Sequence, residues 1–183
     1  MDNLRYIRET MERAGSFTAV PGSGGIAMGV IALLAAVLAA GRPESWEWFG
    51  IWIGAAVLAT AVGVLAAARK AHAAKAKLRS GPGRKFVVGL VPPILAGAVI
   101  SFALLRAGLP ALIPGTWLLL YGTGVLTGGA ASVKIIPVMG ICFVAMGTVA
   151  LFFPAAAGNW FLAAGFGGLH IVFGTIIRVK YGG

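Results

Sequence analysis

The stretch that decides the fold runs from Arg69 to Lys85 and reads RKAHAAKAKLRSGPGRK. It holds seven of the chain's fifteen basic residues and no acidic residue, and long apolar segments lie on both sides of it. Clusters of Lys and Arg beside apolar spans mark the cytoplasmic side of a membrane protein. This stretch therefore predicts how the chain is oriented in a membrane and where it divides.

The composition indicates a multi-spanning membrane protein. The 183 residues are 59% apolar and 11% charged, whereas soluble domains carry about 25% charged residues. The net charge of +10 is confined to short segments between apolar spans, which favours membrane orientation over nucleic-acid binding. We therefore expect the lipid bilayer, and no nucleic acid, as the partner of most of the surface.

Six apolar segments are each close to the roughly 20 residues that cross a bilayer. They cover residues 24–40, 48–68, 86–105, 115–133, 135–153 and 160–177. Because they are continuously apolar, they predict helices and not the alternating strands of a barrel. The short connections predict three antiparallel hairpins, so the expected fold is an all-α, polytopic membrane protein with six transmembrane helices. Pro92 and Pro93 predict a bend in the third helix, or the point where that helix effectively begins.

The chain divides into five parts around the basic stretch. They are residues 1–23 (an amphipathic amino-terminal helix and linker), 24–68 (hairpin 1), 69–85 (a basic cytoplasmic segment), 86–133 (hairpin 2) and 134–183 (hairpin 3 with a short tail). The helix expected over residues 2–14 either lies on the membrane or covers the cytoplasmic ends of the bundle. Residues 16–25 are expected to be flexible. The second helix is expected to continue past Arg69 until Ser80-Gly-Pro-Gly83 breaks it.

The distribution of Lys and Arg predicts that both termini are cytoplasmic. The inner segments hold Arg5, Arg8, Arg13, the seven basic residues of 69–85, Lys134, Arg178 and Lys180, whereas the outer connections hold Arg42 and Arg106. The five tryptophans, Trp46, Trp48, Trp52, Trp117 and Trp160, fall near the outer ends, where indole rings prefer the headgroup level. Because the start of the chain contains acids and no short apolar core, we expect no cleavable signal peptide. The location expected is a bacterial-type inner membrane.

An internal repeat is predicted by glycines that recur in register. At an offset of 43 residues Gly97 aligns with Gly140, Gly122 with Gly165 and Trp117 with Trp160. At an offset of 68 residues Gly122 also aligns with Gly54. Each copy is one hairpin, so the copies would be parallel repeats. Small residues at four-residue spacing, such as Ala55, Ala59 and Gly63, predict close helix packing inside the bundle or contact in a homodimer.

The last hairpin resembles one protein family. Its pattern Gly140-x6-Gly147-x2-Ala150-Leu151-x2-Pro154, followed by Gly165 and Gly174, is similar to that of the HdeD-like family of small bacterial inner-membrane proteins. The resemblance implies an acid-stress-associated membrane protein with no established catalytic residues, so no site residue is carried over. The basic stretch and the amphipathic start are not part of that pattern.

His170 is the candidate site residue, because an ionisable side chain deep in a span is a functional candidate by default. With Tyr121 and Thr127 it could form a ligand or proton site. The alternative is a neutral histidine that is hydrogen-bonded to Tyr121, Thr127 or a carbonyl, and hydroxyl groups of span residues often bond back to their own helix. All five acids lie outside the spans, and the lone Cys142 has no metal-ligand spacing around it. We therefore expect no catalytic residue, metal or cofactor.

The basic stretch has a functional interpretation beside its topological one. Each Lys or Arg near an anionic leaflet contributes about 1 kcal/mol. The candidates for contact with anionic lipids or an acidic partner are Arg69, Lys70, Lys75, Lys77, Arg79, Arg84 and Lys85. The alternative is that these charges only set topology.

Three functions remain open from the sequence. The first is a small non-enzymatic membrane protein with a structural, stress-related or accessory role. The second is a small transporter or channel with a polar site near His170. The third is a subunit of a larger membrane complex or homo-oligomer that docks through its small-residue faces.

Overall fold

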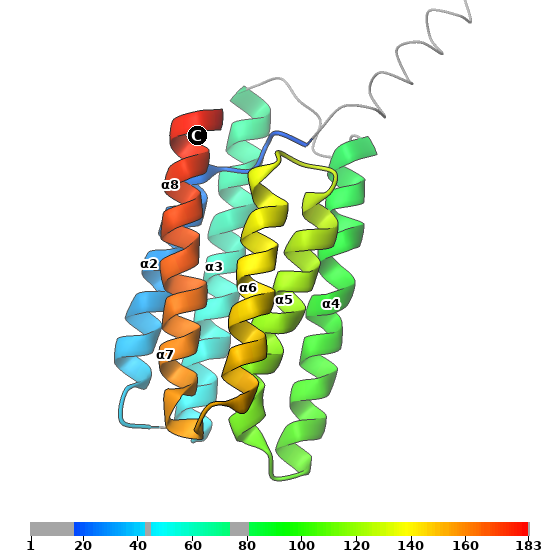
Figure 1. Cartoon of the computed structure of the whole chain (residues 1–183). Helices are drawn as coiled ribbons and strands as arrows, with labels where there is room; N and C mark the ends of the chain where they lie inside the picture. Colours follow the sequence, from blue (N-terminus) through cyan, green and yellow to red (C-terminus); the bar gives the residue numbers. More distant parts are fainter. Residues whose placement is uncertain (1–16, 43–44, 74–80, 183) are drawn as a thin grey trace, which may run out of the picture.

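The computed structural model describes residues 17–42, 45–73 and 81–182, which form a bundle of roughly parallel and antiparallel helices (Figure 1). The α-helices are α2 (Gly22–Ala39), α3 (Trp46–Ala73), α4 (Gly81–Arg106), α5 (Ile113–Gly129), α6 (Ile135–Phe152), α7 (Gly158–Leu162) and α8 (His170–Tyr181). A π-helical segment, Ala163–Leu169, joins α7 to α8 without a break. Within the described residues six helical spans are long and apolar enough to cross a membrane. The predicted all-α, polytopic fold is confirmed.

Two helices extend beyond their predicted apolar spans. α3 continues to Ala73, as the helix-forming residues after Arg69 predict, and α4 already begins at Gly81. Pro82 lies in the first turn of α4, where a missing N–H costs nothing because it has no acceptor in the helix. Pro92 and Pro93 lie inside α4, so the alternative that this helix begins at the prolines is wrong.

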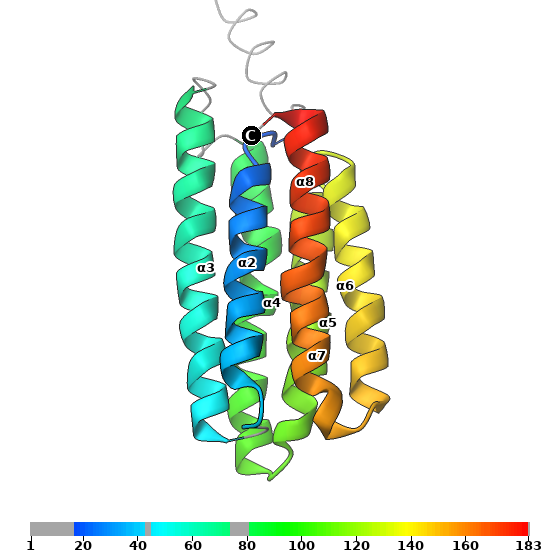
Figure 2. The same ribbon diagram turned by 90° about the vertical axis from the view of Figure 1, so that its left-hand side faces the viewer.

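The helices form two layers of three. In one layer α2 packs between α3 and α8, and in the other α5 packs between α4 and α6. Figure 2 looks onto the layer of α3, α2 and α8, with α4 and α5 fainter behind it. The first two hairpins, α2–α3 and α4–α5, are therefore packed pairs. The last two spans instead lie in different layers, because α8 packs along α2 and α6 packs along α5.

Glycines hold the closest helix pairs together. A Cβ atom on Gly174 of α8 would lie 2.8 Å from the carbonyl oxygen of Gly22 in α2. A Cβ atom on Gly140 of α6 would lie 2.6 Å from the backbone nitrogen of Leu126 in α5. Such backbone contact is what small residues permit in lipid. Of the small residues predicted to pack closely, Gly128 does so, since a Cβ atom there would lie 2.6 Å from the carbonyl oxygen of Phe86 in α4, whereas Ala55 and Ala59 line a cavity.

The glycines that the predicted repeat aligns have different surroundings. A Cβ atom on Gly54 would meet nothing within 4 Å, and one on Gly122 would lie 2.9 Å from the carbonyl oxygen of Gly140. One on Gly165 would lie against the side chains of Leu118 and Met146. The aligned glycines therefore do not share one packing role, and the repeat stays a prediction.

The chain before α2 is fixed to one end of the bundle. The Phe17 N–H donates to the carbonyl of Ala131 at 2.7 Å, and the Ser132 hydroxyl donates to the carbonyl of Phe17 at 2.6 Å. The Phe17 ring also lies 5.1 Å from that of Phe86. The expectation of a flexible segment is wrong for residues 17–25, because these contacts tie Phe17 to α4 and to the α5–α6 turn, and residues 22–25 already belong to α2. The amphipathic helix predicted for residues 2–14 lies outside the described residues.

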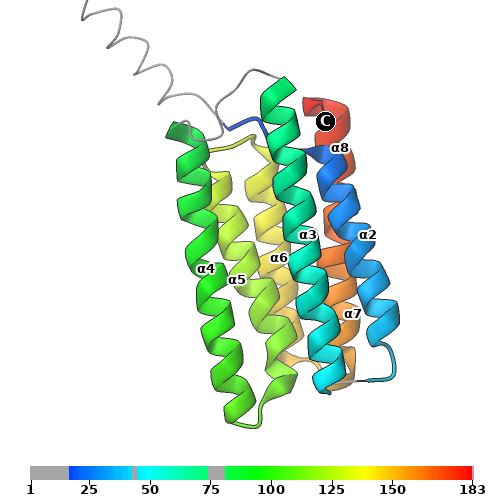
Figure 3. The same cartoon turned by 180° about the vertical axis from the view of Figure 1, so that it is seen from behind.

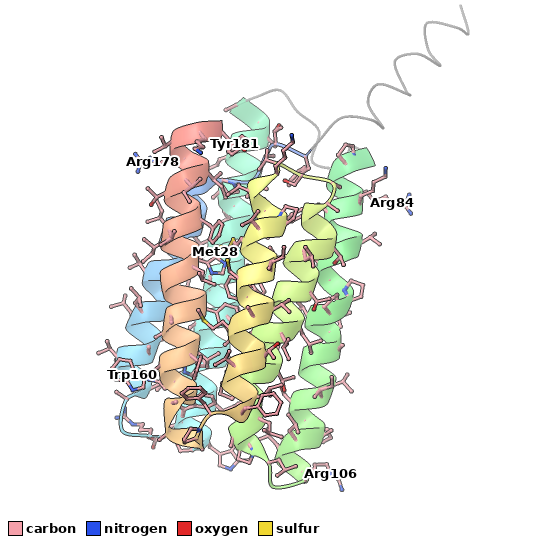
Figure 4. All side chains as sticks on the ribbon, in the orientation of Figure 1. Met28, Arg84, Arg106, Trp160, Arg178 and Tyr181 are labelled. Carbon is pink, nitrogen blue, oxygen red and sulfur yellow. The ribbon has the colours of Figure 1, made fainter. Side chains whose placement is uncertain are left out.

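Both ends of the described chain lie at the same end of the bundle. Figure 4 shows Arg84, Arg178 and Tyr181 at this end, and Arg106 and Trp160 at the opposite end. This end also carries Arg69, Lys70, Lys85, Lys134 and Lys180, whereas the other carries Arg42 and Arg106. The structure thus brings together the basic segments that the sequence places on one side of the membrane.

Candidate functional site

A cavity of about 430 Å³ lies between the two layers, with α3 on one side and α5 on the other. Figure 3 shows the molecule from behind, with α5 between α4 and α3 in this view. Six aromatic side chains line the cavity: Trp48, Phe49, Trp52, Trp117, Tyr121 and Phe166. Among the described residues that line it there is no Asp, Glu, Lys or Arg. Its volume is within the range of small-molecule sites, roughly 300–1,000 Å³.

The cavity exists because α3 is held at a distance from α5. α3 packs closely along α2, where a Cβ atom on Gly63 would lie 2.8 Å from the Met28 sulfur. Beyond Trp48 and Trp52, the part of α3 that lines the cavity includes three small residues, Ala55, Ala56 and Ala59. Opposite them α5 presents Trp117 and Tyr121, which are one turn apart and therefore share a face. Alanines opposite aromatic rings leave space that neither side fills.

The Tyr121 hydroxyl and the His170 ring form the polar end of this cavity. The hydroxyl oxygen lies 2.7 Å from His170 Nε2, which is hydrogen-bond distance. His170 is 4% exposed, and its ring stacks against that of Phe166 with the centroids 6.1 Å apart. The prediction that His170 has Tyr121 as a hydrogen-bond partner is confirmed. Both side chains also line the cavity, so the pair is a candidate ligand contact as well.

The other ring nitrogen of His170 has no regular partner. Nδ1 is buried and makes no hydrogen bond of normal geometry with a residue that the structure describes. The backbone carbonyls of Gly165 and Phe166, one turn back, lie close enough to interact with the ring. These carbonyls belong to the π-helical segment, in which the regular backbone ladder is shifted, and such segments are frequent at functional sites. The sequence signal for this segment was the cluster of glycines before His170.

Thr127 lies outside the site. Its hydroxyl donates to the carbonyls of Gly89 in α4 and Thr123 in its own helix, both at 2.9 Å. The prediction that groups Thr127 with His170 and Tyr121 is therefore wrong, because Thr127 faces α4 and joins α4 to α5. Four other span threonines donate to the carbonyl four residues earlier in their own helix: Thr116, Thr123, Thr148 and Thr175.

Asn159 forms a polar cluster at the end of the cavity that the sequence did not predict. Its Oδ1 atom accepts hydrogen bonds from the Nε1–H groups of Trp48 at 3.2 Å and Trp52 at 3.1 Å. Its Nδ2 group donates to the carbonyl of Ala36 at 3.0 Å. One side chain of α7 thereby joins α3 to α2. The Ser45 hydroxyl caps α3 beside it by accepting from the Trp48 backbone N–H at 3.0 Å.

This cluster corrects the interpretation of two tryptophans. Trp46 and Trp160 are 79% and 75% exposed, as expected for rings at the headgroup level. Trp48 is only 5% exposed, and Trp48 and Trp52 both give their N–H groups to Asn159. These two rings therefore face the bundle interior, where they form one wall of the cavity. The signal that could have found them is the amide of Asn159 at the start of an apolar span.

Among the basic residues, Lys70 differs from its neighbours. Its ammonium donates to the carbonyl of Val20 at 2.9 Å and to those of Tyr181, at 3.3 Å, and Gly182. It therefore stabilises the carboxyl end of α8, where a cation is favourable, and is not available for a lipid headgroup. Arg69, Arg84 and Lys85 are exposed and remain candidates. The predicted contacts Lys75, Lys77 and Arg79 lie outside the described residues.

In the part of the chain that the structure describes, no three His, Cys, Asp or Glu side chains lie close enough together to hold a metal ion. Comparison of the chain with protein-family models, with curated proteins and with solved structures finds no match. The site must therefore be interpreted from its own geometry.

Proposed function

We propose that the chain is a non-enzymatic, multi-pass inner-membrane protein whose accessory role is to hold a neutral, apolar small molecule between its helices. The observation that carries this proposal is the cavity between α3 and α5, with its aromatic wall. Sites for small molecules are mostly apolar concavities with a few polar groups that fix orientation. The Tyr121–His170 pair supplies those polar groups.

The lining favours a neutral ligand. A charged molecule would lose its hydration in this cavity without meeting a counter-ion, which costs several kcal/mol per ion. Glu47 is the one carboxylate side chain among the described residues, and it pairs with Arg42 at 3.0 Å near the end of the bundle. Neither of these charges lines the cavity.

The same geometry supports binding without chemistry. General acid–base or nucleophilic catalysis needs several reactive groups held together. Around His170 the neighbouring rings are Tyr121, Phe143 and Phe166, with centroid distances of 5.4, 5.4 and 6.1 Å. A single imidazole surrounded by aromatic rings serves as a contact or an orienting group, and no carboxylate of the described residues lies beside it to complete a catalytic pair.

We place the basic end of the bundle in the cytoplasm, because this end carries most of the Lys and Arg residues. Arg69, Arg84 and Lys85 would then face the anionic inner leaflet. The three-hairpin repeat and the resemblance to HdeD-like proteins belong to this proposal as sequence-based predictions. A stress-related role follows from the resemblance alone.

Transport is the second candidate function. The observation in its favour is that the cavity lies within the bundle and includes an ionisable side chain, His170. Against it, Thr127 faces α4, and Thr116, Thr123, Thr148 and Thr175 bond to their own helices, which leaves Thr60 as the one span threonine that lines the cavity. Assembly into a homo-oligomer or a larger complex stays a prediction from the small-residue faces.

Saturable binding tests the proposed function. The protein is placed in nanodiscs in a Trp46→Phe, Trp160→Phe background, which removes the two most exposed indoles and leaves those that line the cavity. We expect 4-bromobiphenyl to quench the remaining fluorescence to a plateau, because bromine quenches indole on contact. Ala59→Phe, at a half-buried position that lines the cavity, should fill it and abolish the plateau. Ala61→Phe, on an exposed face of the same helix, should retain it. Quenching that rises without a plateau and is equal in both variants would refute the proposal.

A further inference from the structure

The Tyr121–His170 pair in the cavity offers a ligand one specific kind of hydrogen bond. Two of the cavity's N–H groups, on Trp48 and Trp52, are already donated to Asn159. The Tyr121 hydroxyl contacts His170 Nε2, and a hydroxyl oxygen carries two lone pairs beside its proton. What the Tyr121 oxygen can still offer depends on which group donates in this pair.

The chemistry of the two groups decides the direction of that hydrogen bond. A phenolic O–H is a stronger donor than an imidazole N–H, and an imidazole nitrogen is a stronger acceptor than a phenolic oxygen, so the 2.7 Å contact favours Tyr121 as the donor and Nε2 as the acceptor. A neutral imidazole carries its proton on one nitrogen and a lone pair on the other. The proton is therefore assigned to Nδ1, which leaves Nε2 as the acceptor.

With Nε2 as the acceptor, the Tyr121 hydroxyl must donate to it. The proton of Tyr121 is then used, and the lone pairs of its oxygen remain for the ligand. A ligand that carries a hydroxyl group can donate to this oxygen, but a ketone or an ether has no proton to give. The pair therefore selects a donor over an acceptor.

The walls add a preference for ring-shaped molecules. Trp117 and Phe166 line the cavity beside Tyr121, and aromatic faces stack well on other flat rings.

We infer that the cavity binds a neutral, ring-bearing lipophile through a hydroxyl group that donates to the Tyr121 oxygen. This inference rests on the proposed binding function and specifies its ligand class. It predicts that an aromatic alcohol binds and that the matching ether binds less well. A phospholipid acyl chain, which has no hydroxyl, would instead fill the cavity with no such preference.

Matched probes test the hydroxyl preference in the same nanodiscs and the same tryptophan background. 4-Bromo-4′-hydroxybiphenyl and 4-bromo-4′-methoxybiphenyl share their rings and quencher and differ in the donor. One neutral hydrogen bond corresponds to about fivefold in affinity, so the hydroxyl probe should bind about fivefold more tightly. Each dissociation constant is corrected for the probe's partition into protein-free nanodiscs.

Two variants distinguish the hydrogen bond from general packing. Tyr121→Phe should remove the preference, because it weakens binding of the hydroxyl probe and leaves the affinity for the ether probe unchanged. His170→Phe should remove it in the opposite way, because the freed Tyr121 proton can now donate to the ether oxygen and strengthen its binding. Saturable binding of both probes with equal affinity, or a preference that survives Tyr121→Phe, would overturn the inference while leaving the binding function intact. An absence of saturable binding by any of the three biphenyls would overturn both.

Discussion

The contact between α2 and α8 makes a sharp prediction at Gly174. A Cβ atom there would lie 2.8 Å from the carbonyl oxygen of Gly22, 2.8 Å from the backbone nitrogen of Ile26 and 3.1 Å from the carbonyl carbon of Gly25. All three atoms belong to the backbone, so no side-chain rotation can relieve the clash. Gly174→Ala therefore forces the two helices apart by several tenths of an ångström.

The expected cost combines two opposing effects. Overpacking of a close contact costs about 1–3 kcal/mol. Replacing Gly by Ala inside a helix stabilises the helix by up to about 1 kcal/mol. The control is Gly54→Ala, because Gly54 is also within a helix and its Cβ position is open. We expect Gly174→Ala to lower the free energy of unfolding, and Gly54→Ala to leave it unchanged or raise it.

The displacement at Gly174 should also reach the site. The His170 carbonyl lies 3.6 Å from the Cβ position of Gly25, and Gly174 is one turn further along α8. A shift of α8 away from α2 therefore moves the His170 ring relative to Tyr121. SDS titration in mixed micelles measures the unfolding free energy, and probe quenching measures the site. Equal unfolding free energies for the two alanine variants would show that the α2–α8 backbone contact is not what holds the layer together.

The remaining predictions concern the ends of the bundle. Asn159→Ala removes three hydrogen bonds, and at about 0.6 kcal/mol each in a membrane bundle it should lower the unfolding free energy by about 2 kcal/mol in the same SDS titration. A membrane-impermeant maleimide added to intact cells should label Leu109→Cys and not Tyr181→Cys, since both positions are exposed but lie at opposite ends; the reverse result would invert the proposed orientation. Lys70→Met should speed amide hydrogen exchange in the last turn of α8, whereas Arg69→Met, whose side chain is exposed, should not.

The fold class could be predicted because the thickness of the bilayer fixes the length of each apolar span. A helix that spans it must be apolar over a fixed length, so hydropathy along the chain locates each span. Hydropathy alone does not locate the helical ends. The start of α4 at Gly81 was not predicted, whereas the continuation of α3 beyond its apolar span was. There the helix depends on the intrinsic preferences of Ala and Lys and on the backbone contacts of Lys70.

The pairing of helices could not be read from the sequence in the same way. Connectivity suggests that neighbours in the chain are neighbours in space, and this holds for α2–α3 and α4–α5. It fails for the last pair, because the contact of Gly22 with Gly174 joins helices at opposite ends of the chain. A glycine pattern marks where backbones approach closely but does not name the partner. Which helix packs against which depends on the shape complementarity of all six helices together.

The site was predicted in part for a similar reason. His170 and Tyr121 were found because ionisable and hydroxyl groups are rare in spans, and the structure places them 2.7 Å apart. Thr127 was added to them because it has the right chemistry on the right helix, but its face of α5 turns toward Gly89. Asn159 was missed because the tryptophans around it already had an explanation as interface anchors. A residue type that suits two environments gives no signal for choosing between them.

The small residues of this chain have two different uses, and the contrast explains where the cavity is. Between α2 and α8, glycines face glycines, and the backbones touch. Along α3, alanines such as Ala56 face aromatic rings such as Trp117 across open space. α3 does not collapse into that space because it is held at both ends, by Asn159 at one and by Lys70 at the other. An apolar void with fixed walls loses dispersion contacts at every lining atom, so a ligand that restores them binds without having to deform the bundle.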